Sequence, residues 1–209
     1  MKTAAILFLA AAVLPVFFSK NRSAPFWLAF QALALAWAGL ASHGDWNGHT
    51  LPRLIEVLGV RGLIAPILLH RAIRGRAEPN LDLMPSNLFV WAIAITLIVL
   101  AFQFGAPAMD ERNAITLGAI GATVVVSLLL LASNESPPAQ LVAVLFMENA
   151  LALFESLLPE PWPLPVHAAL GIIYVATVAV GSWLIGEPDH AGTTDAMATA
   201  GDAAREPRQ

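Results

Sequence analysis

The sequence contains no cysteine, and this absence excludes several kinds of chemistry at once. Without a thiol, the 209-residue chain forms no disulfide, no iron–sulfur cluster and no thiolate metal site. It also lacks a phosphate-binding glycine loop, a His-x-x-x-His pair and a nucleophile elbow. The sequence therefore predicts no cofactor, no metal site and no catalytic centre of its own.

Charged residues are also scarce. They make up 12% of the chain, against roughly 25% in ordinary soluble proteins, whereas hydrophobic residues make up 57%. The mean hydropathy is +0.69. The net charge is −4, so no basic surface for nucleic acid is expected. This composition predicts an all-α, polytopic transmembrane helix bundle in contact with the lipid bilayer.

Long apolar segments recur from the first residue to about position 186, and they predict about seven helices. Their approximate bounds are 1–18, 25–41, 53–73, 88–104, 114–131, 139–158 and 164–185. Turn-forming residues separate most of them, as in Gly44-Asp45-Trp46-Asn47-Gly48 and Ser136-Pro137-Pro138. The first segment also has features of a signal peptide, but no small-residue cleavage site follows it, which favours a retained helix.

The positions of lysine and arginine predict the orientation of the helices, since these residues favour cytoplasmic loops. Lys20 and Arg22 lie in the first predicted loop, and Arg71, Arg74 and Arg76 lie in or beside the third. The loops on the other side carry few basic residues. The N-terminus is therefore expected outside and the C-terminus inside.

Composition divides the chain into three expected parts. Residues 1–105 form an N-terminal four-helix part, and residues 113–186 form a C-terminal three-helix part. From 187 to 209 the apolar pattern disappears and acidic and small residues dominate. This last segment is expected to be a disordered cytoplasmic tail.

Glu148 and the following Asn149 lie near the middle of the sixth predicted helix. A charge at the bilayer centre costs about 2.5–3.5 kcal/mol on insertion scales, so such a residue is a functional candidate. Desolvation favours the neutral carboxyl and suits it to take up and release a proton near neutral pH. The alternative is a packing hydrogen bond to a neighbouring subunit.

Arg61 lies about eight residues into the third predicted helix, too deep for its side chain to reach the outer face easily. Pro66 disrupts the helical hydrogen bonds nearby, and interrupted helices at membrane depth often line polar cavities. Arg61 therefore needs a partner. It belongs either to a functional site or to a structural ion pair, with Glu56 or with a partner protein.

Three further ionisable residues, Glu56, Glu155 and His167, lie closer to predicted helix ends. For the two glutamates an interfacial position within reach of water is the favoured interpretation. His167 can relay protons, although an imidazole at a helix end is more often a headgroup-region residue. Gln31, at membrane depth, is expected to form interhelical hydrogen bonds.

Two segments, Arg61 to Leu69 and Phe146-Met147-Glu148-Asn149-Ala150, together resemble the hydrogenase-4 component E family. The second is similar to that family's Met-Glu-Asn-Gly segment. The first is similar to its Lys-Val-Leu-Leu-Val-Pro-Leu-Ile segment, with a basic residue five positions before Pro66 and an arginine-bearing loop behind it. Chain length and helix count agree along the whole membrane portion.

The resemblance implies a function and partners. The three C-terminal helices of that family are similar to subunit K (chain 4L) of respiratory complex I, which carries glutamates on a lateral proton path. It implies a non-catalytic membrane-arm subunit of a hydrogenase-4-like or complex-I-like oxidoreductase complex, beside antiporter-like subunits, in the bacterial cytoplasmic (inner) membrane. The subunit would contribute to proton or cation translocation through Glu148, Arg61, Asn149 and His167.

The chain departs from the family pattern at two positions, and two other interpretations stay open. The last helix has no carboxylate, so either His167 substitutes for it or that half of the path is altered. Arg61 stands where the family has lysine, and arginine cannot itself hand on a proton. The open alternatives are a stand-alone small-solute membrane transporter and a purely structural assembly subunit.

Overall fold

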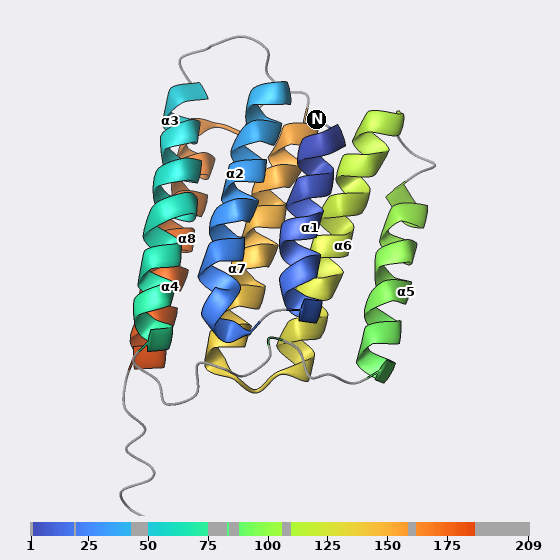
Figure 1. Cartoon of the computed structure of the whole chain (residues 1–209). Coiled ribbons are helices and arrows are strands. Elements are labelled where there is room, and N and C mark those ends of the chain that lie inside the picture. The colour runs from blue at the N-terminus through green and yellow to red at the C-terminus, as the bar shows by residue number, and fades with distance from the viewer. Residues whose placement is uncertain are drawn as a thin grey trace, which may run out of the picture.

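Helices packed side by side make up the computed structural model, which describes residues 2–18, 20–42, 50–74, 83, 88–105, 110–158 and 162–186 (Figure 1). They are α1 Lys2–Phe18, α2 Ala24–Ser42, α3 Thr50–Ile55, α4 Ala65–Arg74, α5 Leu88–Gly105, α6 Glu111–Ser133, α7 Pro137–Phe154 and α8 Leu164–Gly186. A π-helical segment, η2 (Glu56–Ile64), joins α3 and α4 into one continuous helix, and a 3-10 turn, η4 (Glu155–Leu157), extends α7. The all-α prediction is confirmed, with seven separate helices in the described part of the chain.

The helices agree with the predicted segments to within a few residues. For example, the segment predicted at 53–73 forms the continuous helix from Thr50 to Arg74. At the start of α7, Pro137 and Pro138 fit because the first helical turn needs no backbone N–H donors. The predicted turn at 44–48 and the predicted tail at 187–209 lie outside the described residues.

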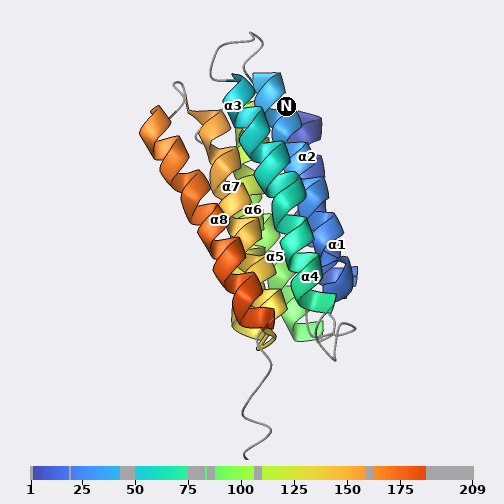
Figure 2. The same ribbon diagram turned by 90° about the vertical axis from the view of Figure 1, so that its left-hand side faces the viewer.

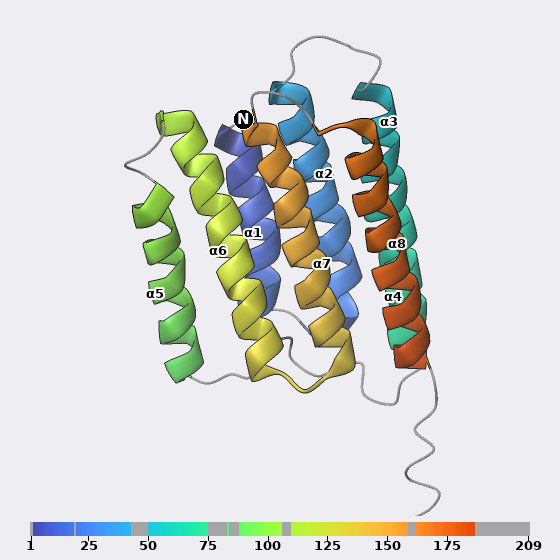
Figure 3. The same ribbon diagram turned by 180° about the vertical axis from the view of Figure 1, so that it is seen from behind.

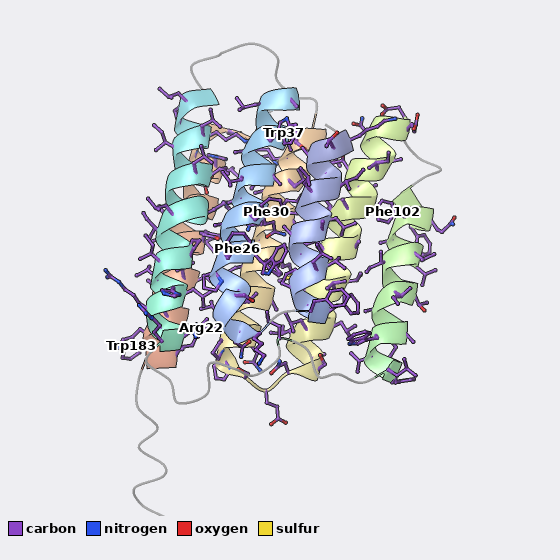
Figure 4. All side chains as sticks on the ribbon, in the orientation of Figure 1. Arg22, Phe26, Phe30, Trp37, Phe102 and Trp183 are labelled. Atoms are coloured by element: carbon purple, nitrogen blue, oxygen red, sulfur yellow. The ribbon has the colours of Figure 1, made fainter. Side chains whose placement is uncertain are left out.

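Four of the described helices are long and apolar enough to cross a membrane by length and composition. The candidate spans are Asn21–Ala41, Asn113–Ser133, Pro137–Leu157 and Pro165–Gly186. Helices α1 and α5 are apolar but shorter. Two exposed tryptophans, Trp37 and Trp183, lie toward opposite ends of the bundle (Figure 4), where the aromatic belts of membrane proteins lie.

The helices form two layers. Helices α1, α2 and α3–η2–α4 lie in one layer, and α6, α7 and α8 lie in the other (Figure 2). Across the layers α1 packs on α6, α2 on α7 and α4 on α8, while α5 lies at the edge beside α6 (Figure 3). We call the end of the bundle where α1 begins the upper end, and the end where α8 stops the lower end, as drawn in Figure 1.

Two apolar clusters fill the space between the layers. The upper cluster includes Ala4, Phe8, Leu35, Val57, Ala150 and Leu153. The lower cluster is larger and includes Val16, Leu28, Ala65, Leu69, Phe146 and Tyr174. Each cluster combines residues from the predicted N-terminal and C-terminal parts, so the two parts pack against each other and do not form separate cores.

Small residues bring α5 and α6 close together. A Cβ added at Gly118 would overlap the ring of Phe102, and one added at Gly121 would lie 3.3 Å from Ala101 Cβ. Close approach through small residues is a common way for apolar helices to associate, because it increases van der Waals contact. The glycines therefore fix the distance between these two helices.

This geometry predicts a disulfide between introduced cysteines at Ala101 and Gly121. The 3.3 Å separation of their Cβ positions is close to the roughly 3.5–4.5 Å found in disulfides. Because the natural chain has no cysteine, the double variant Ala101→Cys/Gly121→Cys has no competing thiol. Mild oxidation is expected to cross-link nearly all molecules, as measured by mass spectrometry.

The matched control is Ala101→Cys/Gly59→Cys, because a Cβ at Gly59 meets no other atom within 4 Å. This pair is expected to keep both thiols free. Free thiols at positions 101 and 121 under the same oxidation would contradict the packing of α5 on α6.

Candidate functional site

Arg61 is the centre of a buried polar cluster, with 4% of its surface exposed. Its Nε donates to Glu56 Oε1 at 2.7 Å, and its Nη1 donates to Asn149 Oδ1 at 3.0 Å. The same nitrogen reaches the backbone oxygen of Glu148 at 3.3 Å. The guanidinium carbon lies 4.2 Å from the centre of the Tyr174 ring, a cation–π distance. The arginine is therefore paired, hydrogen-bonded and stacked at once.

The π-helical segment makes the Glu56–Arg61 pair possible. In an α-helix, residues five positions apart point about 140° away from each other, since each residue turns about 100°. The wider π-helical turn brings them to the same side. At its end the N–H of Ala65 bonds to Val60, five residues back, just before Pro66, which has no N–H to donate. The interruption expected at Pro66 is thus a wide turn in an unbroken helix.

One carboxyl oxygen of Glu148 has no hydrogen-bond partner among the described residues. Its Oε1 accepts a hydrogen bond from Thr177 Oγ1 at 3.1 Å. Its Oε2 is buried and accepts none from any residue within the described ranges. Arg61 pairs with Glu56 and contacts only the backbone of Glu148. Glu148 and Arg61 are therefore not in a direct ion pair, and Oε2 is available to a proton.

Asn149 connects the two layers beside this carboxyl. Its side chain is fully buried, and its Nδ2 donates to Gln31 Oε1 on α2 at 2.9 Å. Its Oδ1 is occupied by Arg61, so the amide orientation is fixed from both sides. Gln31 is equally buried. The expected interhelical role of Gln31 is confirmed for the α2–α7 contact.

A second group of charges lies nearer the upper end of the bundle. Glu155 Oε2 lies 3.4 Å from Arg53 Nη2 and 3.6 Å from His167 Nδ1. The other imidazole nitrogen, Nε2, lies 3.8 Å from Glu56 Oε2. The side chain of Glu155 is 5% exposed and that of Glu56 is 17% exposed. Glu155 is thus buried and Glu56 is partly buried, and both glutamates, for which an interfacial position was expected, form ion pairs.

A cavity of about 80 Å³ connects the two groups of charges. Its lining residues are Glu56, Arg61, Glu148, Leu151, Ala152, Glu155, Trp162, His167, Leu170 and Ile173. Five of these ten lining residues are ionisable and offer hydrogen-bond partners to water, which occupies about 30 Å³ per molecule in the liquid. Five of the six predicted site residues line this cavity, and the sixth, Asn149, binds Arg61 beside it.

Sequence reasoning missed three polar residues of the site. Arg53 pairs with Glu155, Thr177 binds Glu148, and Tyr174 lies under Arg61. A signal for two of them was present in the last helix, where positions 167, 170, 174 and 177 repeat at spacings of three and four. That spacing places His167, Tyr174 and Thr177 on one helical face.

The site brings together acidic, basic and imidazole side chains, and the described residues contain no group of three His, Cys, Asp or Glu side chains placed to hold a metal ion. It offers two carboxylates paired with arginines, one further carboxyl, one imidazole and a cavity with room for water. No protein-family model, curated protein or solved structure matches this chain significantly. The assignment of function therefore depends on the geometry and on the resemblance described above.

The buried pair predicts a strong effect of Arg61→Met on stability. The substitution leaves the Glu56 carboxylate without its cation, which costs about 3–5 kcal/mol for buried pairs. In the double variant Arg61→Met/Glu56→Gln no unpaired charge remains, so more than half of the loss should be recovered. The free energy of unfolding in detergent micelles measures both effects. Equal destabilisation by the single and double variants would contradict the pairing.

The exposed ion pair between Lys2 and Glu111 provides the control. Lys2 Nζ lies 2.7 Å from Glu111 Oε1, and this ammonium holds the pKa of Glu111 below its usual range. Both side chains are largely open to water, which screens the interaction. Lys2→Met is therefore expected to leave the free energy of unfolding unchanged within error.

Proposed function

We propose that this chain is a non-catalytic membrane-arm subunit of a hydrogenase-4-like or complex-I-like respiratory complex in a bacterial cytoplasmic membrane, with Glu148 as a carrier in proton translocation. The observation that carries the proposal is the Glu148 carboxyl at mid-height in the bundle, with Oε2 free of described partners and a cavity beside it. The resemblance of the Arg61 and Glu148 segments to the hydrogenase-4 component E family supports the same function.

The surroundings of Glu148 suit proton transfer. Thr177 holds one oxygen in place, so the carboxyl has a fixed orientation. The second oxygen can bind and release a proton without breaking an ion pair, because Arg61 is neutralised by Glu56. Intramembrane carboxyls that face a polar cavity are typical of proton relays in pumps and transporters.

The cavity favours protons over larger solutes. Pockets for small molecules usually measure about 300–1,000 Å³, several times the 80 Å³ found here. A stand-alone solute transporter would need a much larger space at this position. The ion pairs alone also suit a purely structural subunit. A structural role does not explain why Glu148 Oε2 is buried without a hydrogen-bond partner among the described residues.

We assign the chain to the membrane and not to the redox part of the complex. Helix α8 is the least covered of the four candidate spans, with 17% of its apolar window buried, against 50–56% for the others. That exposed face supports contact with lipid and with antiporter-like subunits. Helix α1 ends, α2 begins and α4 ends at the lower end (Figure 1). The exposed basic residues at these helix ends, Lys20, Arg22, Arg71 and Arg74, support a cytoplasmic position for that end.

A purification experiment tests the assignment to a complex. The chain is tagged at its C-terminus, extracted from its native membrane in mild detergent, and its partners are identified by mass spectrometry. We expect antiporter-like subunits together with quinone-reductase-like or [NiFe] subunits. A chain that emerges alone and monodisperse would contradict the assignment.

The variant Glu148→Gln tests the proton-carrying role in the assembled complex. Glutamine keeps the shape and a hydrogen bond to Thr177 but cannot ionise, so proton transport should fall roughly 100-fold, a typical effect of losing a proton-transfer group. Transport is measured with a pH-sensitive dye in proteoliposomes. The control Glu111→Gln removes an exposed carboxylate at the upper end and should transport like the natural protein. Unchanged transport in Glu148→Gln would exclude the role, and a dissociated complex would favour the structural alternative.

A further inference from the structure

His167 occupies a position between two carboxylates that already have cationic partners. Its two ring nitrogens lie 3.6 Å from Glu155 Oε2 and 3.8 Å from Glu56 Oε2. Glu155 also pairs with Arg53, and Glu56 pairs with Arg61. The imidazole therefore faces charges from α3, η2 and η4 while it sits on the first turns of α8.

Among the described residues, the charges around the cavity sum to zero before His167 and Glu148 are counted. Arginines stay protonated in proteins, so Arg53 and Arg61 contribute two positive charges. The carboxylates of Glu56 and Glu155, each in contact with one of these arginines, contribute two negative charges. The hydroxyl groups that border Glu148, those of Thr177 and Tyr174, are neutral.

His167 and Glu148 are thus the two described groups that decide the net charge of the cavity. Two arrangements leave it neutral: a proton on Glu148 beside a neutral imidazole, or a proton on His167 beside an ionised Glu148. The other two arrangements leave one uncompensated charge inside the bundle. An uncompensated charge in a medium of low dielectric constant is costly, so the two neutral arrangements are favoured.

The cavity supplies a route between the two groups. Both residues line it, and its volume of about 80 Å³ fits two or three waters at about 30 Å³ each. Glu148 and Glu155, which contacts His167, are seven residues apart, so about 10 Å of helix rise separates the two ends of the route. A short file of hydrogen-bonded waters covers such a distance.

We infer that His167 and Glu148 share a single proton through this cavity, so that the imidazole is loaded from the upper end and passes its proton to Glu148 while the net charge stays constant. In this step an imidazolium N–H bond breaks and a Glu148 O–H bond forms, with water carrying the proton between them and no electron moving. The inference rests on the proposed role of Glu148. It adds His167 as the residue that delivers the proton, and the condition that the net charge of the cavity stays constant.

Infrared spectroscopy of the full chain in lipid nanodiscs tests the coupling directly. The C=O band of protonated Glu148 is identified by its loss in Glu148→Gln and followed across a pH series. With His167→Arg, which places a permanent cation at the site, the ratio of protonated to ionised Glu148 should fall about tenfold or more at a given pH. With the neutral variant His167→Gln, the protonated band should persist to higher pH than in the natural protein.

The matched control is His70→Arg, because His70 lies on α4 and is not among the residues that line the cavity. The Glu148 band should titrate in this variant as in the natural protein. Thermal unfolding shows whether each variant is folded. A Glu148 band that titrates identically in His167→Arg, His167→Gln and the natural protein would overturn the inference.

A reciprocal measurement covers the case in which His167→Arg does not fold. Coupling between two sites acts equally in both directions, so neutral Glu148→Gln must lower the protonated fraction of His167 at a given pH. Nuclear magnetic resonance of isotope-labelled histidine measures that fraction, and an unchanged fraction would also overturn the inference. Neither readout depends on transport or on partners. If the protonation of His167 and Glu148 is coupled but Glu148→Gln transports protons normally, the proposed function is rejected. The inference that the two residues share a proton then still holds.

Discussion

The burial of one guanidinium group is the constraint on which much of this structure depends. Arg61 cannot lose its charge, so the protein must surround it with acceptors. A carboxylate from η2, an amide and a carbonyl from α7 and an aromatic ring from α8 meet this requirement. Three helices are thereby held around one side chain. The wide turn in the third of the predicted helices is part of the same solution, since it aligns Glu56 with Arg61.

The polar residues form a layer between the two apolar clusters. Arg61 lies between Val57 of the upper cluster and Ala65 of the lower one, and Asn149 lies between Ala150 and Phe146 in the same way. The two apolar clusters each extend across the two helix layers. The ionisable groups begin at the depth of Arg61 and Glu148 and extend from there toward the upper end, where Glu155 and His167 lie. The site is thus a polar layer that extends toward the upper end of the bundle.

The sequence predicted the helices well because each is defined by a long apolar segment with turn residues beside it. It also pointed to Glu148, Arg61, Asn149 and His167, since polar residues stand out in such segments. The ion pair of Arg61 with Glu56 was only one of the alternatives, because spacing five does not pair on an α-helix and a π-helical turn has no clear sequence signal. The burial of Glu155 depends on where α3 and α8 pack, which one segment alone does not reveal.

The cavity extends from Glu148 toward the upper end, and this would have an electrical consequence for a bundle that spans a membrane. Water that filled the cavity from the upper side would carry the potential of that side inward, so that most of the voltage would fall across the apolar lower cluster between Glu148 and the opposite face. A membrane potential of about 100 mV is worth about 2.3 kcal/mol for one charge that crosses the whole field. A proton on Glu148 would therefore sit near one end of that field although its carboxyl lies at mid-height. The apolar packing around Phe146 and Leu69 would then serve as the insulator that separates the two sides.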